Sequence, residues 1–182
     1  MKKIMIIWIF VIILIIGLCG CNEEKDQTED PLKNLEYIND EYNFGINPPE
    51  NWTINQDNVE SFVVLFIGPT EKNYQVNLGI SIPETLASDE TLDNVVDEIN
   101  ENYPIIFTEN LTWHSKGSKN INGLDAYEIV FSYNYSIYHI KQKQVLILKN
   151  NIVYTFTYSA LTGTYNNYIS SIDETINSFT VD

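Results

Sequence analysis

The chain has 182 residues, of which 44% are hydrophobic and 19% charged, a composition that fits one globular domain and excludes a disordered chain. Acidic residues outnumber basic ones 25 to 10, and the net charge of −15 repels phosphate backbones, so we expect no nucleic-acid partner. Cys19 and Cys21 are the two cysteines, so the rest of the chain can form neither a disulfide nor a cysteine-bound metal site.

The first twenty residues have the features of a secretory signal. Two lysines precede an apolar run over residues 4–19, and Gly20 lies before Cys21. A basic start, an apolar stretch and a small residue before the cleavage point are typical of exported proteins. The segment Leu18-Cys19-Gly20-Cys21 resembles the lipobox of prokaryotic lipoproteins, in which the last cysteine is lipidated and becomes the first residue after cleavage.

Residues 1–20 are therefore predicted to be a lipoprotein signal peptide, with lipid on Cys21 anchoring the protein to the membrane. The alternative is an uncleaved membrane helix, but the apolar run is shorter than the roughly 20 residues that span a bilayer. In both cases the domain lies on the extracytoplasmic face. Residues 21–40 carry the lipidated cysteine and an acidic segment whose charges repel one another, so we expect an extended tether.

From residue 41 onward, short strands are predicted between turn-forming residues. Alternating apolar positions indicate strands over residues 42–46, 52–54 and 76–82, and an apolar run indicates another over 62–67. Further strands are predicted from residue 111, over 127–135, 140–148 and 153–158. The dipeptide Asn122-Gly123 is a strong hairpin signal, and Asn150-Asn151 marks a second turn.

Two helices are predicted from apolar residues that recur at helical spacing. The first contains Leu92, Val95, Val96, Ile99 and Tyr103, with Ser88 or Asp89 as its cap and Pro104 as its end. The second starts near residue 164 and repeats the same spacing up to residue 176. Together the elements predict an α+β fold, an antiparallel β-sheet with flanking helices in an α/β/α-type sandwich.

Several segments, in this order, resemble the PsbP-like family. They are Tyr42-x-Phe44-x-Ile46-x-x-Pro49-x-x-Trp52, Gly123-x-x-Ala126-Tyr127, Val153-Tyr154-Thr155-Phe156-Thr157 and Ser178-Phe179. The resemblance covers residues 40–182. It implies an antiparallel sheet flanked by helices and a role other than catalysis. Among the members of that family, the bacterial envelope lipoproteins share the N-terminal features of this chain.

Residues that could support catalysis are few. The sequence contains no GxSxG, HExxH, Walker, GxGxxG or CxxC motif, so we expect no enzymatic activity and no cofactor. His114 and His139 stand alone in predicted strands. Either could act as a base only if the fold brought a carboxylate or hydroxyl partner close to it.

Two sets of side chains could instead form binding surfaces. Glu90, Asp93, Asp97 and Glu101 fall on one side of the first helix, where a divalent cation would relieve their repulsion; a plain solvated helix face is the alternative. Tyrosines crowd the second half of the chain, and a partner-binding surface is predicted at residues Tyr133, Tyr135 and Tyr138, unless they are buried.

Three functional hypotheses follow. The first is a non-catalytic accessory or binding module, lipid-anchored outside the cell membrane, for an envelope protein partner. The second is a lipoprotein that binds a small ligand or divalent cation, which a concave apolar pocket with a few convergent polar groups would favour. The third is a hydrolase centred on His114 or His139.

Overall fold

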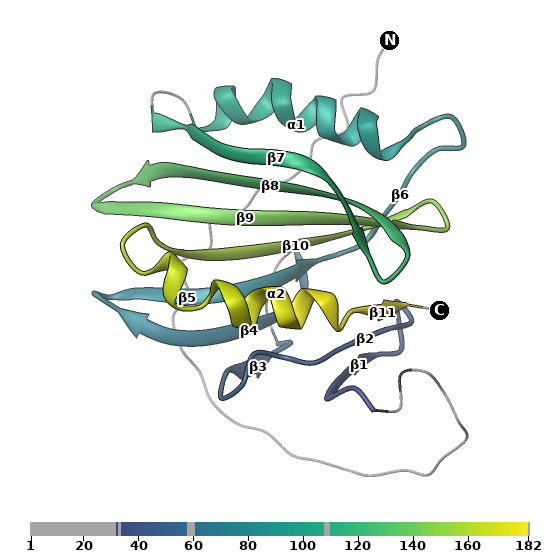
Figure 1. Cartoon of the computed structure of the whole chain (residues 1–182), viewed down its shortest axis with the longest axis horizontal. Coiled ribbons are helices and arrows are strands. Elements are labelled where there is room, and N and C mark those ends of the chain that lie inside the picture. The colour runs from purple at the N-terminus through teal and green to yellow at the C-terminus, as the bar shows by residue number, and fades with distance from the viewer. Residues whose placement is uncertain (1–31, 33, 58–60, 108–109, 182) are drawn as a thin grey trace.

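The computed structural model describes residues 32, 34–57, 61–107 and 110–181, and Figure 1 shows their arrangement. The predicted signal peptide, Cys21 and most of the predicted tether lie outside these residues. Within the described ranges, no helix combines the length and the hydropathy that crossing a membrane would require.

The described chain is built mostly of β-strands. Its helical segments are α1 (Leu92–Ile106), the short 3₁₀ helix η2 (Tyr165–Asn167) and α2 (Ile169–Asn177). The strands are, in chain order, β1 (Tyr37–Asn39), β2 (Phe44–Ile46), β3 (Thr53–Asn55), β4 (Phe62–Glu71), β5 (Tyr74–Ser81), β6 (Glu84–Thr85), β7 (Thr112–Ile121), β8 (Leu124–Tyr135), β9 (Tyr138–Lys149), β10 (Ile152–Leu161) and β11 (Thr180–Val181).

Most strands belong to one antiparallel sheet with the order β3-β4-β5-β10-β9-β8-β7, and β6 pairs with β10. The long hairpin β8–β9 keeps one register from Asp125 opposite Leu148 to Tyr135 opposite Tyr138. Asn122 and Gly123, with φ of 51° and 84°, both adopt the left-handed conformation of a tight two-residue turn, as the sequence predicts. Strands β1, β2 and β11 form a separate three-stranded sheet.

The two faces of the large sheet pack on different helices. Ile172 and Ile176 of α2 belong to one apolar cluster, with Phe156 and most of the apolar side chains of β4, β5 and β10. Ile99 and Tyr103 of α1 belong to the other, with the apolar side chains that β8 and β9 turn to the opposite face. The period-two alternation of these strands therefore places one helix against each face.

Helix α1 follows the predicted apolar stripe, but its ends differ from the prediction. Thr91, rather than Ser88 or Asp89, caps the helix: its hydroxyl accepts from the backbone N–H of Asn94, whose side chain accepts from the backbone N–H of Thr91. Pro104 lies inside the last turn. The helix continues past this proline because the backbone N–H of Phe107 still reaches the Tyr103 carbonyl, at 2.9 Å.

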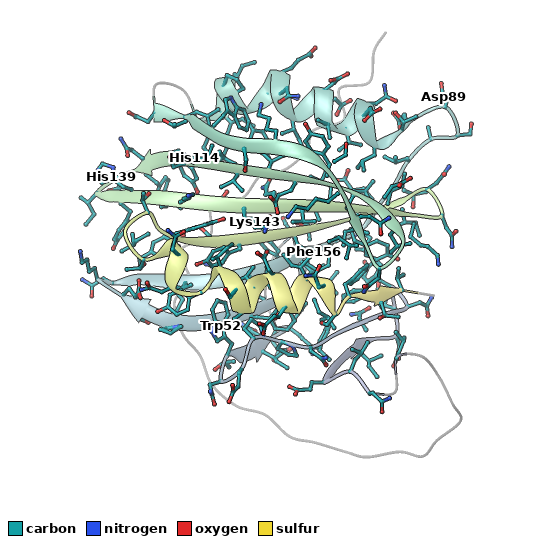
Figure 2. All side chains as sticks on the ribbon, in the orientation of Figure 1. Trp52, Asp89, His114, His139, Lys143 and Phe156 are labelled. Carbon is teal, nitrogen blue, oxygen red and sulfur yellow. The ribbon has the colours of Figure 1, made fainter. Side chains whose placement is uncertain are left out.

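A buried lysine joins α2 to the sheet. Lys143 of β9 is 4% exposed, and its Nζ pairs with Glu128 of β8 at 2.6 Å and with Asp173 of α2 (Figure 2). Burial alone would raise the pKa of the Glu128 carboxyl, but hydrogen bonds from Lys119 and Lys143 outweigh that effect and hold it below its ordinary range. The charge is therefore compensated, as a buried charge must be.

The predicted α+β class is confirmed, and the sandwich is confirmed in part. A large antiparallel sheet packs on two helices, but these helices are small compared with the sheet. A second, three-stranded sheet lies beside α2 (Figure 1). Strand β1 lies within the segment 21–40 that the sequence predicts to be tether. Tyr37 is only 4% exposed and packs on Phe44 and Phe66, so the compact domain begins earlier than residue 41.

We expect Phe156→Ala to lower the free energy of unfolding by about 3–5 kcal/mol, because it leaves a cavity in the core. Phe156 is fully buried, and its ring contacts that of Phe179 edge to face at 5.0 Å. Urea denaturation of the purified protein would measure the loss. The control Ile137→Ala removes a side chain that is 81% exposed and should cost less than about 0.5 kcal/mol. Equal losses in the two variants would contradict this assignment of the core.

Candidate ligand-binding cavity

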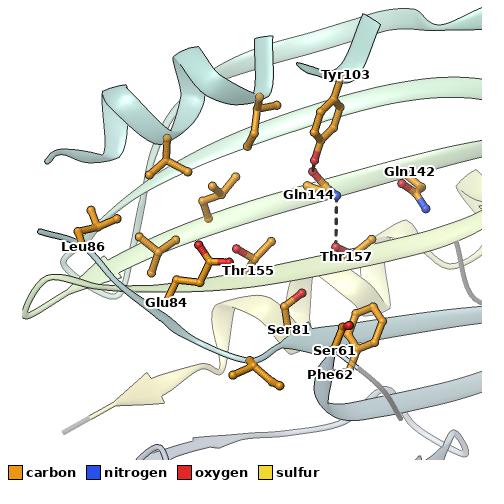
Figure 3. Close-up of a pocket in the computed structure, with 15 residues that line it drawn as sticks. Ser61, Phe62, Ser81, Glu84, Leu86, Tyr103, Gln142, Gln144, Thr155 and Thr157 are labelled. Atoms are coloured by element: carbon orange, nitrogen blue, oxygen red, sulfur yellow. Dashed lines mark hydrogen bonds between the residues drawn. The ribbon is translucent and has the colours of Figure 1, made fainter. Parts of the chain in front are cut away.

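A cavity of about 440 Å³ opens on the face of the large sheet that α1 covers in part (Figure 3). Its volume falls in the range of roughly 300–1,000 Å³ that is usual for small-molecule sites. The lining residues come from α1, from strands β5, β6, β9 and β10, and from the segment that enters β4. They are Ser61, Phe62, Ser81, Ile82, Glu84, Leu86, Val95, Ile99, Tyr103, Gln142, Gln144, Leu146, Val153, Thr155 and Thr157.

The wall of the cavity is apolar. Val95 and Ile99 face it from α1, and Leu86 closes the end next to β6, each of them buried. On the opposite side, Phe62 lies across Gly79 of β5. A Cβ atom at Gly79 would stand 2.4 Å from the Phe62 ring, so glycine is what allows this ring to lie flat on the sheet.

The floor of the cavity is polar, because β9 and β10 turn amides and hydroxyls toward α1. The Tyr103 hydroxyl donates to Oε1 of Gln144, whose Nε2 donates to Oγ1 of Thr157 at 3.4 Å (Figure 3). Gln144 is 4% exposed and Tyr103 is 2% exposed. Burial strongly raises the pKa of the Tyr103 hydroxyl, so this phenol stays neutral and serves as a hydrogen-bond donor.

Gln142 is the second buried amide of the floor, with 6% of its surface exposed. Its Nε2 donates to Oγ of Ser159 at 3.3 Å, but its Oε1 has no hydrogen-bond partner among the described residues. The Tyr133 hydroxyl, also without a hydrogen-bond partner among those residues by the same geometric measure, is close enough to this amide for the amide to affect the titration of the hydroxyl. Burial raises the pKa of Tyr133, and its proximity to Gln142 offsets part of that rise.

A carboxylate lies at the other end of the cavity. Glu84 of β6 is the one charged residue among the described residues that line the cavity, and Figure 3 shows it at the end away from Gln142. Desolvation raises the pKa of Glu84, and the negative charge of Glu98 on α1 raises it further. Oε2 of Glu98 is itself buried without a hydrogen-bond partner among the described residues.

The acidic residues of α1 do not converge on a metal site. Asp93, Asp97 and Glu101 are exposed on the solvent side of the helix. Glu90 precedes the helix and accepts a hydrogen bond from the backbone N–H of Ala87 at 2.8 Å. Within the described part of the chain, no three His, Cys, Asp or Glu side chains come together as metal ligands would. The described positions agree with the solvated helix face given as the alternative, and cation binding by these carboxylates stays a prediction.

The three tyrosines of the predicted partner surface do not share one environment. Tyr133 is 4% exposed and packs between Phe107 and Phe131 under α1. Tyr138 is half-buried, and its hydroxyl donates to the Asn73 carbonyl at 3.2 Å. Tyr135 is 38% exposed. The aromatic face of β8 is therefore partly core, and binding of a partner by Tyr135 stays a prediction.

The two histidines lie near one end of the sheet (Figure 2). Nε2 of His114 is 2.9 Å from Oγ of Ser132, which is the hydroxyl partner that the hydrolase hypothesis requires. Burial, and then the charge of Lys141, lower the pKa of His114. His139 bonds to Asn134. No described carboxylate pairs with either ring, so the orienting group of a catalytic triad is missing from the described residues.

Sequence analysis missed the polar floor of the cavity. Gln142 and Gln144 interrupt the apolar strand that was predicted over residues 140–148, and Thr155 and Thr157 do the same in the next strand. Two paired strands with polar residues at matching positions are the signal that could have found it. The register places Gln144 opposite Thr157 and Gln142 opposite Ser159, so these positions form one stripe across the sheet.

Comparison with models of known protein families shows which family the chain belongs to. The model of the PsbP-like protein family matches residues 4–181, which is nearly the whole sequence, so the chain belongs to the PsbP-like family. No protein in the curated set matches it.

Solved structures share this fold at low sequence identity. Cyanobacterial PsbP (CyanoP) from Synechocystis sp. PCC 6803 is 15% identical with a TM-score of 0.60, covering 80% of this chain and 91% of its own. LpqN of Mycobacterium tuberculosis, which is involved in cell envelope biogenesis, is 14% identical with a TM-score of 0.57, covering 76% and 82%. PA94 of Pseudomonas aeruginosa, a protein of unknown function, is 16% identical with a TM-score of 0.53, covering 69% and 80%.

We expect Glu84→Gln to raise the thermal midpoint at pH 7 and to have no effect at pH 3. A carboxyl whose pKa is raised in the folded protein destabilises the fold only where it is ionised, so its cost is absent below the ordinary glutamate pKa and complete above the raised value. The gain should not exceed about 2 °C, because the side chain is partly open to solvent.

Thermal denaturation at both pH values would measure this difference. Glu101→Gln makes the same change of charge on the solvent side of α1 and serves as the control. A gain that is larger at pH 3 than at pH 7, or equal in the two variants, would show that Glu84 is not held in a desolvated position.

Proposed function

We propose that the chain is a non-catalytic binding module, tethered by lipid to the extracytoplasmic face of the cell membrane, and that the cavity beneath α1 is its binding site. The cavity is the observation that carries this proposal. It combines an apolar wall with a few convergent polar groups, as small-molecule sites do. Membership of the PsbP-like family and the fold shared with LpqN fit an accessory role in the cell envelope.

Binding rather than turnover is favoured by the chemistry of the lining. The buried polar groups are neutral amides and hydroxyls that bond to one another, as Tyr103, Gln144 and Thr157 do. Such a network positions a ligand, but it offers neither an activated nucleophile nor a base beside one.

The proposed location at the membrane rests on the N-terminal segment. Lipid on Cys21 would hold the domain at the membrane, with the acidic segment between the lipid and the first strand at Tyr37. Two or more acyl chains anchor a protein stably, since each buried methylene contributes about 0.8 kcal/mol. The negative charge of the chain would at the same time keep the domain away from anionic lipid.

An envelope protein as partner is the second candidate function, and one exposed apolar surface favours it. The turn between β8 and β9 carries Ile137, 81% exposed, next to Tyr135. The C-terminal end of α1 carries Ile105, 72% exposed, and Ile106, 46% exposed, at the same end of the molecule (Figure 1). Large apolar side chains exposed at one end of a molecule are candidates for a contact surface.

We expect Cys21→Ala to abolish both lipidation and removal of residues 1–20, because the lipidated thiol is what the processing step recognises in the proposed lipobox. Growth with an alkyne-tagged fatty acid, followed by intact mass spectrometry, would measure the two together. Cys19→Ala is the matched control, and it should remain tagged and cleaved. An untagged wild-type protein, or a Cys21→Ala variant that is tagged like the wild type, would overturn the proposed anchor.

A further inference from the structure

One buried polar atom of the cavity lining has no hydrogen-bond partner among the described residues, and it is an acceptor. Gln144 uses its oxygen for Tyr103 and its nitrogen for Thr157, so both ends of this amide are engaged within the protein. Gln142 uses its nitrogen for Ser159 and leaves Oε1 without a partner in the described structure. Leaving a buried acceptor without a donor is unfavourable, so a ligand that donates a hydrogen bond at this point is favoured.

The charge of the cavity lining disfavours an anionic ligand. Glu84 is charged and partly open to solvent at the far end of the cavity, and no lysine or histidine is found among the described lining residues. The whole sequence contains no arginine. An anionic ligand would therefore meet one negative group, with the carboxylate of Glu98 close behind it, and no positive group to compensate its charge.

Between these two ends the cavity is apolar on its α1 side. Val95 and Ile99 line this stretch from α1, Leu146 of β9 lines it from the sheet, and each is less than 9% exposed. Figure 3 shows Glu84 and Gln142 at opposite ends, with Thr155 and Gln144 between them. A ligand that contacts both ends passes beneath these apolar side chains, so apolar atoms on the α1 side of its middle are favoured.

We propose that the cavity binds a small amphipathic amine, in which an ammonium group pairs with Glu84, an apolar stretch lies under α1, and a neutral donor such as a hydroxyl bonds to Oε1 of Gln142. This inference rests on the proposed binding function of the cavity and names the chemical class of its ligand. The raised pKa of Glu84 agrees with it, since a carboxylate that is poorly compensated in the empty site gains from a cation.

Three probes of one length separate the contributions of the two ends. They are 8-aminooctan-1-ol, which carries both groups; octan-1-amine, which lacks the hydroxyl; and 8-hydroxyoctanoate, in which a carboxylate replaces the ammonium group. Titration of the isotope-labelled domain by NMR gives each dissociation constant and shows which residues respond. We expect the amino alcohol to bind about 3- to 10-fold more tightly than the amine, and the hydroxy acid to bind at least about tenfold more weakly than the amino alcohol.

Two variants assign these differences to residues. Gln142→Met keeps the length of the side chain and removes the acceptor, so the advantage of the amino alcohol over the amine should disappear. Glu84→Gln should reduce the preference for ammonium over carboxylate by about three- to fivefold or more, whereas Glu101→Gln should leave every constant unchanged. The comparison of probes on the wild-type protein stands by itself if Gln142→Met fails to fold.

Each outcome decides a different claim. If the amine binds as tightly as the amino alcohol, Oε1 of Gln142 is satisfied within the protein, with Tyr133 as its donor, and the two-ended ligand is overturned. If the hydroxy acid binds as tightly as the amino alcohol, the charge assignment is overturned, while the cavity remains a binding site. If no probe shifts the resonances of the lining residues at millimolar concentration, both this inference and the proposed binding function are overturned.

Discussion

The alternation of side chains along β9 and β10 is the constraint on which the rest of the structure depends. On one face these paired strands present Val145, Ile147, Phe156 and Tyr158, which form the core beneath α2. On the other face the same strands present Gln142, Gln144 and three hydroxyl residues in register. Because a strand turns successive side chains to opposite faces, neither set can change its position without displacing the other.

This polar stripe explains why the two helices pack so differently. α2 lies on an apolar face and is fixed by the pair between Lys143 and Asp173, so its side of the sheet is closed. α1 packs closely only where β8 and β9 are apolar, against Ile129 and Phe131, and it leaves the polar stripe partly uncovered. The cavity is therefore a consequence of the strand sequences, since amides and hydroxyls in that stripe cannot form a dry core unless all are paired.

Sequence reasoning predicts those features that depend on local patterns. The α+β class, the hairpin at Asn122-Gly123 and the apolar stripe of α1 follow from alternation, turn chemistry and helical spacing. The site could not be predicted in this way, because Glu84, Tyr103 and Gln142 come together only through the order of strands in the sheet. The burial of individual tyrosines could not be predicted for the same reason. Tyr133 and Tyr135 lie two positions apart on one strand, but Tyr133 packs on Phe107 at the end of α1 and is 4% exposed, whereas Tyr135 is 38% exposed.

Native mass spectrometry of the protein extracted from the membranes of its own host tests the central claim most directly. If the cavity is an occupied binding site on an anchored protein, the spectrum will show the lipidated chain together with one noncovalent organic adduct. Collisional activation will release that adduct as a cation, and Gln142→Met will reduce its share. A spectrum of the lipidated chain alone, combined with recovery of one envelope protein that depends on Ile137, would contradict the claim and make the apolar end of the sheet the functional surface.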